Sequence, residues 1–598
     1  MLTRSRSRVR GRSRALAGPI VTAVVLTLVA VSALAVSAGA GTTMVEPPPG
    51  AGKPTAGSGI GTAAALNNPR CVHDEARARY GDYGAFDSTS VGGGPICVRP
   101  WKDGDDNGGS TYQGVTADKV KVVVLLPNEE QKANPANSAP INQADNSKGT
   151  YEDAVHDVLL SYLPWYETWG RDIEIKFLTS SGGDEAAQRA DAVAAKAEKP
   201  FAAMHMIVEG LDVFEAEMAN AKVLSWGYGT TFSKAVKQAP YRWGQSDAQA
   251  GAINSAEVIG KQLVGKKAEY AGDESLQGQT RKFGVVYMPN LIDVDDLKKN
   301  LAKYKGTIAV ASPYEGNGAT FGDPAVSQEQ APLFVTKMKQ AGVTTVILFS
   351  DVSMTTHLME EAIKQEWYPE WWFTGAVYHD IGALARGYPK EQSVNAFGIS
   401  FLSPYLARDE LYFQLLANNW YWGRGVSTTG ASVTSQLVWL LQGIHTAGPK
   451  LTPTTFQQGL FSLPATGGAA TENPASSMTA YGRNAGLPYD EYMTQGLDYA
   501  PWWWDPEQYG PSSGNLGEGL GVGWYLDGAK RYKASTWPKR QFDWFSKEGA
   551  IFQFDTRPVR VEYVGDCAAC PAGGGPGTPG APSLDGFVAV HGQPGTAT

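Results

Sequence analysis

The sequence predicts an α/β protein with two similar doubly wound parallel-sheet lobes, joined by crossing hinge segments and preceded by an N-terminal membrane or signal segment. Three observations support this fold class. Short apolar runs alternate with helical patterns from about residue 114 to 401, as in parallel sheets with crossover helices. The series breaks near residue 246 and then starts again. The 598 residues are long enough for two such cores.

The first series, residues 114–245, is predicted to form lobe 1. Its opening strand, 120–126, is almost wholly apolar, and the helical pattern at 150–162 places apolar residues on one face. The series continues with strands at 173–178, 201–208 and 223–226 and helices at 185–196 and 211–220.

The second series, residues 246–400, is predicted to form lobe 2. It starts with a long helix at 247–264, and its run at 343–349 is rich in β-branched residues, as buried parallel strands are. The remaining strands are expected at 282–288, 307–311 and 371–374, and the helices at 294–304, 330–340 and 352–365.

Residues 401–572 are expected to hold the hinge return, helices of both lobes and an aromatic insertion. The pattern is helical between 409 and 462, loop-rich between 465 and 519, and strand-like at 550–554 and 559–564. The insertion carries Trp502, Trp503 and Trp504, for which packing onto the body is favoured over a sugar-stacking platform. The Gly/Pro-rich tail, 573–598, is predicted to be disordered.

The N-terminus indicates export. Six Arg lie within the first 14 residues, no charge follows from 15 to 45, and 20–36 is strongly apolar. Residues 1–45 are therefore a signal peptide or a membrane anchor. Small residues at 36–40 suit cleavage, whereas the length of the run suits an uncleaved anchor and favours it slightly. A flexible spacer, 46–68, follows. The body is expected to be extracytoplasmic, either tethered or secreted.

The four Cys fit an oxidising compartment. Cys71 and Cys97 bracket a Gly-rich loop in the segment 69–113, and Cys567 and Cys570 form a CxxC near the C-terminus. Two structural disulfides, Cys71–Cys97 and Cys567–Cys570, are the favoured interpretation. Zinc would require a second CxxC, and a redox role is disfavoured because this CxxC lies in a loop rather than at a helix start.

Composition and motifs argue against several function classes. The net charge of −9 disfavours nucleic acid as a partner, because phosphate binding needs clustered Lys and Arg. None of the seven His forms a metal-binding pair, and no nucleophile elbow or phosphate loop appears. His205, inside an apolar strand, is expected to be a core residue, and His379-Asp380 lacks a nucleophile. The chain is therefore predicted not to be an enzyme, with no catalytic residue, metal or cofactor.

In open α/β sheets, ligands bind beyond the carboxyl ends of the strands, so candidate binding residues follow the predicted strands. Gly residues there would let backbone N–H groups approach a ligand, and Asp351 or Glu209 could pair with an ammonium group. Asp351 could equally cap the following helix, and Trp226 could lie in the core or at the site. The candidates are Glu209, Gly227, Tyr228, Gly229 and Thr230 in lobe 1, and Asn290, Ser350, Asp351, Ala376 and Tyr378 in lobe 2.

Several pieces of the chain resemble the type I periplasmic-binding-protein-like family, the branched-chain amino-acid and amide-binding receptors of ABC importers. They are GVTADKVKVVVLLP (114–127), AKVLSWGYGTTFS (221–233), YRWGQSDAQAGAINSAEVI (241–259), KFGVVYMPN (282–290) and KQAGVTTVILFSD (339–351). The N-terminal Cys loop and the stretch 502–532 resemble an actinobacterial subgroup. After the first strand the chain reads NEEQK instead of the usual Gly-rich turn.

This resemblance implies a solute-binding protein that captures a small molecule, such as an amino acid or amide, and delivers it to an ABC permease complex in the membrane. A tethered cell-envelope sensor or receptor without a transporter is the alternative. An enzyme that has adopted the two-lobe scaffold is a third possibility, since fold does not fix function.

Overall fold

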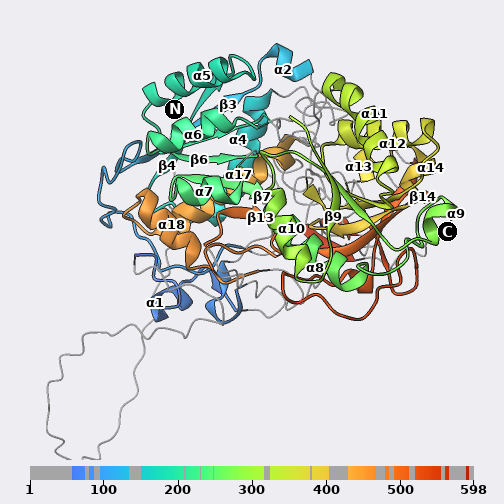
Figure 1. Ribbon diagram of the computed structural model, residues 1–598. Helices are drawn as coiled ribbons and strands as arrows, with labels where there is room; N and C mark the ends of the chain where they lie inside the picture. Colours follow the sequence, from blue (N-terminus) through green and yellow to red (C-terminus); the bar gives the residue numbers. More distant parts are fainter. Residues whose placement is uncertain are drawn as a thin grey trace, which may run out of the picture. The chain divides into compact units, whose positions relative to one another are not determined.

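The body of the chain contains two large β-sheets, which form the cores of the two lobes (Figure 1). The computed structural model describes residues 57–73, 80–86, 94–133, 150–207, 210–228, 230–246, 248–315, 324–376, 380, 382–402, 404, 429–466, 478–483, 490–510, 519–553, 559–563 and 587–591. The predicted signal or anchor segment, 1–45, and the spacer up to residue 56 lie outside these ranges. No helix within them is long and apolar enough to cross a membrane.

The lobe-1 sheet has six parallel strands in the order β4-β3-β5-β6-β7-β13. The strands are β3 (Lys119–Leu126), β4 (Asp172–Thr179), β5 (Ala202–His205), β6 (Leu224–Gly227), β7 (Arg242–Ser246) and β13 (Met493–Gln495). The first four match the predicted runs. β7 lies at the end of the first predicted series, where the series breaks near residue 246, and β13 lies in the stretch expected to be loop-rich.

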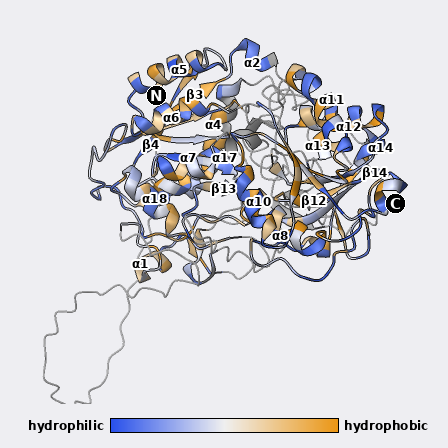
Figure 2. Cartoon of the chain, in the orientation of Figure 1, coloured by the Kyte–Doolittle hydropathy of each residue, from blue (hydrophilic) through white to orange (hydrophobic). Residues whose placement is uncertain are grey.

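Helices cover both faces of the lobe-1 sheet, as a doubly wound fold requires. Apolar side chains of α4 (Tyr151–Tyr162), α17 (Thr429–Ala447) and α18 (Pro453–Phe461) pack in one core cluster, and those of α5 (Glu185–Ala197) and α6 (Asp212–Asn220) pack in the other. In Figure 2 these helices carry both hydrophobic and hydrophilic residues, as amphipathic helices that cover a sheet do. The shorter elements of this lobe are α2 (Glu129–Ala133), η3 (Leu163–Trp165) and α7 (Phe232–Lys237).

The lobe-2 sheet has eight strands in the order β9-β8-β10-β11-β12-β14-β15-β16. The first five, which are parallel, are β8 (Phe283–Tyr287), β9 (Ile308–Pro313), β10 (Thr345–Phe349), β11 (Glu370–Phe373) and β12 (Ala396–Ser400). The last three, which are antiparallel, are β14 (Ala500–Gly510), β15 (Gly519–Tyr525) and β16 (Ile551–Phe552). The sheet is therefore mixed, and not wholly parallel as predicted.

The three tryptophans of the predicted insertion lie in the middle of β14. Successive strand residues point to opposite faces, so Trp502 and Trp504 pack in one core cluster and Trp503 in the other. All three are buried, and Trp503 stacks on Trp524 of β15 at 6.2 Å between ring centroids. The favoured interpretation, packing onto the body, is confirmed. The expectation of a loop is wrong here.

The helices of lobe 2 also divide between the faces of its sheet. Those that pack with Trp502 are α11 (Pro324–Gln340) and α12 (Val352–Lys364), and those that pack with Trp503 are α8 (Ala248–Gln262) and α10 (Val294–Ala302). Shorter elements are α9 (Glu274–Gln277), α13 (Gly382–Ala385), α14 (Lys390–Ser393) and η5 (Asp527–Ala529).

Among the described elements, the chain passes between the two sheets three times: from β7 to α8, from β12 to α17, and from β13 to β14. One buried side chain ties the second and third of these crossings together. The Arg531 guanidinium donates to the carbonyl oxygens of Phe401 and Leu402, each at 2.6 Å, and to the Asp498 carboxylate at 2.9 Å. The second crossing, where it leaves lobe 2, and the third, where it enters lobe 2, are therefore held together.

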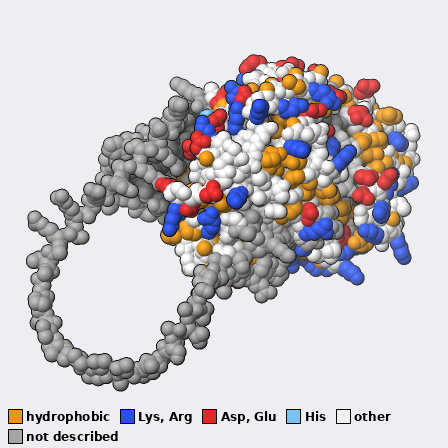
Figure 3. Space-filling view, turned by 90° about the vertical axis from the view of Figure 1, so that its left-hand side faces the viewer, with side chains coloured by type: hydrophobic (Ala, Val, Ile, Leu, Met, Phe, Trp, Pro, Cys, Tyr) orange, Lys and Arg blue, Asp and Glu red, His pale blue; other side chains and the backbone are white. Residues whose placement is uncertain are grey.

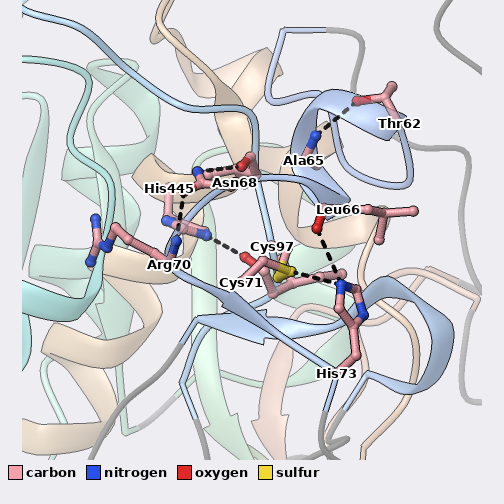
Figure 4. The surroundings of a disulfide bond; sticks show 11 residues. Thr62, Ala65, Leu66, Asn68, Arg70, Cys71, His73, Cys97 and His445 are labelled. Carbon is pink, nitrogen blue, oxygen red and sulfur yellow. Dashed lines mark hydrogen bonds between the residues drawn. A yellow bond between two sulfur atoms is a disulfide. The ribbon is translucent and has the colours of Figure 1, made fainter. Parts of the chain in front are cut away.

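The N-terminal segment packs on lobe 1 and is closed by the predicted Cys71–Cys97 disulfide, which is confirmed (Figure 4). It contains α1 (Ala63–Leu66), β1 (Cys71–Val72), η2 (Gly81–Tyr83) and β2 (Ala85–Phe86). His445 of α17 joins it to the lobe: one ring nitrogen bonds the Ile96 carbonyl oxygen at 2.7 Å, and the other accepts from the Glu167 amide at 2.8 Å. Burial lowers the pKa of His445 to about 3, so the ring is neutral.

The C-terminal segment differs from the prediction in one respect. Within the tail expected to be disordered, 573–598, β18 (Phe587–His591) pairs antiparallel with β17 (Val559–Tyr563). Residues 587–591 read FVAVH, a short apolar run with aromatic and β-branched residues, which is a strand pattern that the surrounding Gly and Pro obscured. The predicted Cys567–Cys570 disulfide lies outside the described residues.

Candidate functional site

The first five strands of both sheets follow the same order, with the second strand in sequence at one edge and the first beside it. The connection that leaves the first strand runs toward one edge of the sheet, and the connection that leaves the third strand runs toward the other edge. Ligands of such folds bind beyond the carboxyl ends of these two adjacent strands. These two strands are β3 and β5 in lobe 1, and β8 and β10 in lobe 2. The predicted binding residues follow strands at the same carboxyl edge of each sheet.

A buried ionic network lies at the lobe-1 edge and is centred on Glu215 of α6, which has no exposed surface. Its carboxylate accepts from Arg242 Nη2 at 2.8 Å, lies 3.1 Å from His205 Nε2, and accepts a short hydrogen bond from Thr230 Oγ1. Arg242 also pairs with Asp212. Burial by itself would raise the pKa of Glu215, but the Arg242 charge and the hydrogen bonds outweigh it and hold that pKa well below its usual value.

This network explains two of the predicted binding residues. A Cβ on Gly227 would lie 1.7 Å from Glu215 Oε1, so glycine is needed there for the carboxylate to pass. The Thr230 hydroxyl donates to Glu215 and accepts from Arg242 Nε at 2.9 Å. Both residues therefore hold the β6 end against α6 and β7. His205 is buried and bonded to Glu215, which confirms that it is a core residue.

Tyr228 follows β6 directly and packs between two aromatic rings. Its ring meets Trp226 edge-on at 5.0 Å and His205 at 5.8 Å between centroids. Its hydroxyl accepts from Gln436 Nε2 at 3.2 Å, and the same amide group donates to the His205 carbonyl oxygen at 2.9 Å. Burial raises the pKa of Tyr228 to about 12, so the hydroxyl keeps its proton. Trp226 is fully buried, which settles its position as core.

The lobe-2 edge places Asp351 at the N-terminus of α12. Its Oδ1 accepts from the Met354 amide at 2.8 Å, which is the helix cap foreseen as one alternative. Its Oδ2 accepts from the Tyr314 hydroxyl at 2.7 Å, which brings the ends of β9 and β10 together. The neighbouring Ser350 is also buried, and its hydroxyl lies 2.9 Å from that of Thr355.

Two further predicted residues follow strands of lobe 2. Asn290 is exposed after β8, and Ala376 is buried after β11. Glu209, Gly229 and Tyr378 lie outside the described residues.

Two residues at the edges were missed by the sequence analysis as binding candidates. Gln436 reaches Tyr228 from α17, more than 200 residues further along the chain, so no local pattern could connect them. Asp380 was noted only for lacking a nucleophile, yet its side chain is fully buried. Among the described residues, no group of His, Cys, Asp and Glu side chains could hold a metal ion.

Comparison with known proteins gives structural neighbours only, since no protein-family model and no curated protein matches the sequence. The chain is similar to a leucine-, isoleucine-, valine-, threonine- and alanine-binding protein from Brucella ovis in its closed conformation. The identity is 11%, the TM-score is 0.44, and the match covers 71% of this chain and 98% of that one.

Two further neighbours have the same identity, 11%. A fatty acid ABC transporter substrate-binding protein from Thermomonospora curvata has a TM-score of 0.43 and coverages of 71% and 94%. An ABC transporter solute-binding protein from Rhodopseudomonas palustris, in complex with 3,4-dihydroxybenzoic acid, has a TM-score of 0.42 and coverages of 70% and 98%. The neighbours are type I periplasmic-binding-protein-like solute-binding proteins of ABC transporters.

Proposed function

We propose that this protein is an extracytoplasmic solute-binding protein that captures a small molecule, such as an amino acid or amide, between its two lobes and delivers it to an ABC permease complex. The observation that carries the proposal is the repeated strand order. The first five strands of the two sheets are parallel and have the same switch point, and crossings of the chain link the sheets, so one chain would supply two binding edges.

Binding in such an arrangement is a matter of differential affinity. A ligand that touches both edges favours the conformation in which it can touch both, and it shifts the population by the difference in its affinity for the two states. The crossings act as the hinge, and Arg531 holds two of them together. The permease would then recognise the ligand-bound conformation.

The candidate contacts are aromatic and polar. Tyr228 offers an apolar ring and a hydroxyl on the lobe-1 edge, with Gln436 beside it. Ser350 and Asn290 follow strands on the lobe-2 edge. Glu209, Gly229, Ala376 and Tyr378 complete the proposed set, while Gly227, Thr230 and Asp351 would support it from behind. On the face drawn in Figure 3, acidic and basic side chains are interspersed, which suits a small ligand better than a polyanion.

The test begins with mass spectrometry of small molecules retained by the purified body. Calorimetry with the retained molecule then compares wild type with Tyr228→Ala and Ser350→Ala. Loss of a buried aromatic anchor should weaken binding by about 1–3 kcal/mol, and loss of one hydrogen bond by about 1 kcal/mol. Ser393→Ala, a buried serine on α14 near the amino end of β12, is the matched control and should leave affinity unchanged.

Small-angle scattering with and without the molecule tests closure. A more compact particle on binding is the expected result. Unchanged affinity in both edge variants would place the site elsewhere, and tight binding without any change in scattering would argue against the transport mechanism.

A further inference from the structure

Asp498 lies on the third crossing, between β13 of lobe 1 and β14 of lobe 2, and its side chain is buried. A single carboxylate oxygen, Oδ1, accepts from two donors. They are Arg531 Nε and the Met478 amide, each at 2.9 Å. One donor belongs to each lobe, so this oxygen joins the lobes directly.

The Met478 donor is part of lobe 1. The next residue, Thr479, exchanges two backbone hydrogen bonds of 2.7 and 2.9 Å with Thr466, which follows α18. Two residues further on, the Tyr481 ring lies 5.8 Å from that of Trp243 in β7, between centroids. This segment is therefore fixed to the lobe-1 sheet, and Met478 moves with it.

The Arg531 donor is part of lobe 2. The next residue, Tyr532, exchanges backbone hydrogen bonds of 2.7 and 2.8 Å with Tyr499, directly before β14. The Arg531 guanidinium also donates to the Phe401 and Leu402 carbonyl oxygens, directly after β12. The second and third crossings therefore share one anchor in lobe 2.

The first crossing reaches the same place. It leads into α8, and a Cβ on Gly251, the fourth residue of that helix, would lie 3.2 Å from the Tyr499 hydroxyl oxygen. The start of α8 thus packs closely on Tyr499, which is buried. The three crossings of the described chain therefore meet lobe 2 around one buried point, next to Asp498.

A strained turn delivers Arg531 to this point. Asp527, Gly528 and Ala529 have φ values of 56°, 63° and 58°, three successive residues in the left-handed region. This conformation is costly for residues with a Cβ and persists only where the surrounding structure fixes it. Here the Asp527 carboxylate accepts from the Tyr532 hydroxyl, which ties the turn to the residue after Arg531.

We propose that the Asp498 carboxylate is the pivot about which the two lobes rotate, and that Arg531 is the residue that fixes this pivot to lobe 2. In a rigid-body rotation, atoms on the axis keep their distances and atoms away from it move apart. A hydrogen bond between the lobes therefore survives closure only on the axis. Gly496, with φ of 85°, lies two residues before Asp498 and can absorb the change in backbone angles.

The proposal rests on the proposed function, because closure is part of it, and it adds a residue that sets the resting equilibrium between conformations. A looser pivot lets the ligand-free lobes adopt more relative orientations. A smaller fraction of the protein is then competent to bind, and the apparent affinity falls by that fraction. The affinity thus changes although no ligand contact is lost.

The first experiment measures the distance between the lobes in the ligand-free protein by pulsed electron spin resonance. Spin labels are attached at Val193→Cys on α5 and Leu333→Cys on α11, both exposed positions, and the chain without these cysteines gives the background. Wild type should give one narrow distance distribution.

Two hinge variants, Arg531→Lys and Asp498→Asn, should widen this distribution. Lysine keeps the charge but lacks the planar fork that reaches two carbonyl oxygens and a carboxylate. Asparagine keeps the shape of Asp498 but replaces charge-assisted hydrogen bonds by weaker ones. Where one of the two variants does not fold, the other carries the comparison.

Arg281→Lys is the matched control. Arg281 is also buried, and it donates to the Glu370 carboxylate at 2.7 and 2.8 Å, entirely within lobe 2. This variant should lower the thermal midpoint as the hinge variants do, because each weakens a buried ion pair. Its distance distribution should remain as narrow as that of wild type.

Hydrogen exchange of the Met478 amide tests the bond between the lobes itself. This amide should be protected in wild type, and Asp498→Asn should raise its exchange rate by about fivefold, because a neutral acceptor replaces a charged one. The Thr479 amide, which donates to the Thr466 carbonyl oxygen within lobe 1, is the internal control and should be unchanged.

The outcomes separate the pivot from the proposed function. A wild-type Met478 amide that exchanges as fast as an unprotected one would overturn the pivot, and so would hinge variants with distributions as narrow as that of Arg281→Lys. If the molecule found by mass spectrometry shifts the wild-type distance while the hinge variants stay narrow, solute binding stands and the pivot does not. If the hinge variants widen the distribution and no retained molecule shifts the wild-type distance, the pivot stands and the proposed function fails.

Discussion

Replacing Glu215 by Gln tests whether the buried network holds the lobe-1 edge together. The variant keeps the shape of the side chain and removes its charge, which leaves the buried Arg242 with Asp212, a half-exposed partner. Removing one member of a buried ion pair costs about 3–5 kcal/mol. Since the amide oxygen can still accept from Arg242, we expect the lower end of that range, about 3 kcal/mol.

The pH dependence gives this prediction a second signature. The pKa of Glu215 is lower in the folded chain than in the unfolded chain, so its contribution is complete above the unfolded value of about 4.5 and is lost as pH falls below it. Wild type should therefore lose stability on acidification below pH 4.5 more steeply than Glu215→Gln, and the gap between them should narrow.

The assay is urea denaturation followed by tryptophan fluorescence, because Trp226 and Trp243 are buried in the same lobe. Glu217→Gln is the matched control: it lies on the same helix, and its carboxylate pairs with Arg189 and Lys196 near the surface. Partly exposed pairs contribute less than about 1 kcal/mol. An equal loss in the two variants, or an equal acid response, would refute the role assigned to the network.

Three further predictions concern lobe 1 and the segment packed on it. Gly227→Ala should displace the Glu215 carboxylate and destabilise the protein about as much as Glu215→Gln in the same urea assay; an unchanged midpoint would contradict the close approach. His445→Gln should remove an acid sensitivity, because the pKa of His445 is lowered to about 3 and wild type should lose up to about 1.4 kcal/mol per pH unit below pH 6.5; parallel pH–stability curves would count against it. Replacing both Cys71 and Cys97 by Ser should lower the free energy of unfolding by about 3 kcal/mol, as measured by calorimetry. A loss of only a few tenths of a kcal/mol would show that the disulfide does not stabilise this loop.

Much of the parallel core could be predicted, because its strands are short, β-branched and bounded by helical patterns. The run predicted at 343–349 forms β10 at Thr345–Phe349, and the helix predicted at 352–365 is α12, Val352–Lys364. In the antiparallel part of lobe 2, β16 lies within the strand predicted at 550–554, but β14 and β15 were missed. Strand β14 contains three adjacent tryptophans and is buried on both faces, so it lacks the alternation of apolar and polar residues that marks a half-buried strand.

The candidate site was predicted less well, and the reason is distance along the chain. Sequence position alone places Thr230 after a strand, where a ligand could reach its hydroxyl. The hydroxyl instead forms hydrogen bonds with Glu215 and Arg242. These two residues come from α6, which precedes Thr230 in the sequence, and from β7, which follows it. Asp351 shows the opposite case, since a cap is a local interaction and the residue pattern alone suggested it.

The last crossing has a consequence for how the protein is made. β13 completes the lobe-1 sheet, yet Met493 pairs with Gly244, about 250 residues earlier in the chain. At a synthesis rate of roughly 5–20 residues per second, the edge of β7 stays open for about 10–50 s after it emerges. An open edge strand invites pairing with other chains. A nascent chain that stops before β13 should therefore aggregate through this edge, so the interval in which the protein most needs a chaperone or export partner runs from the completion of β7 to the arrival of β13.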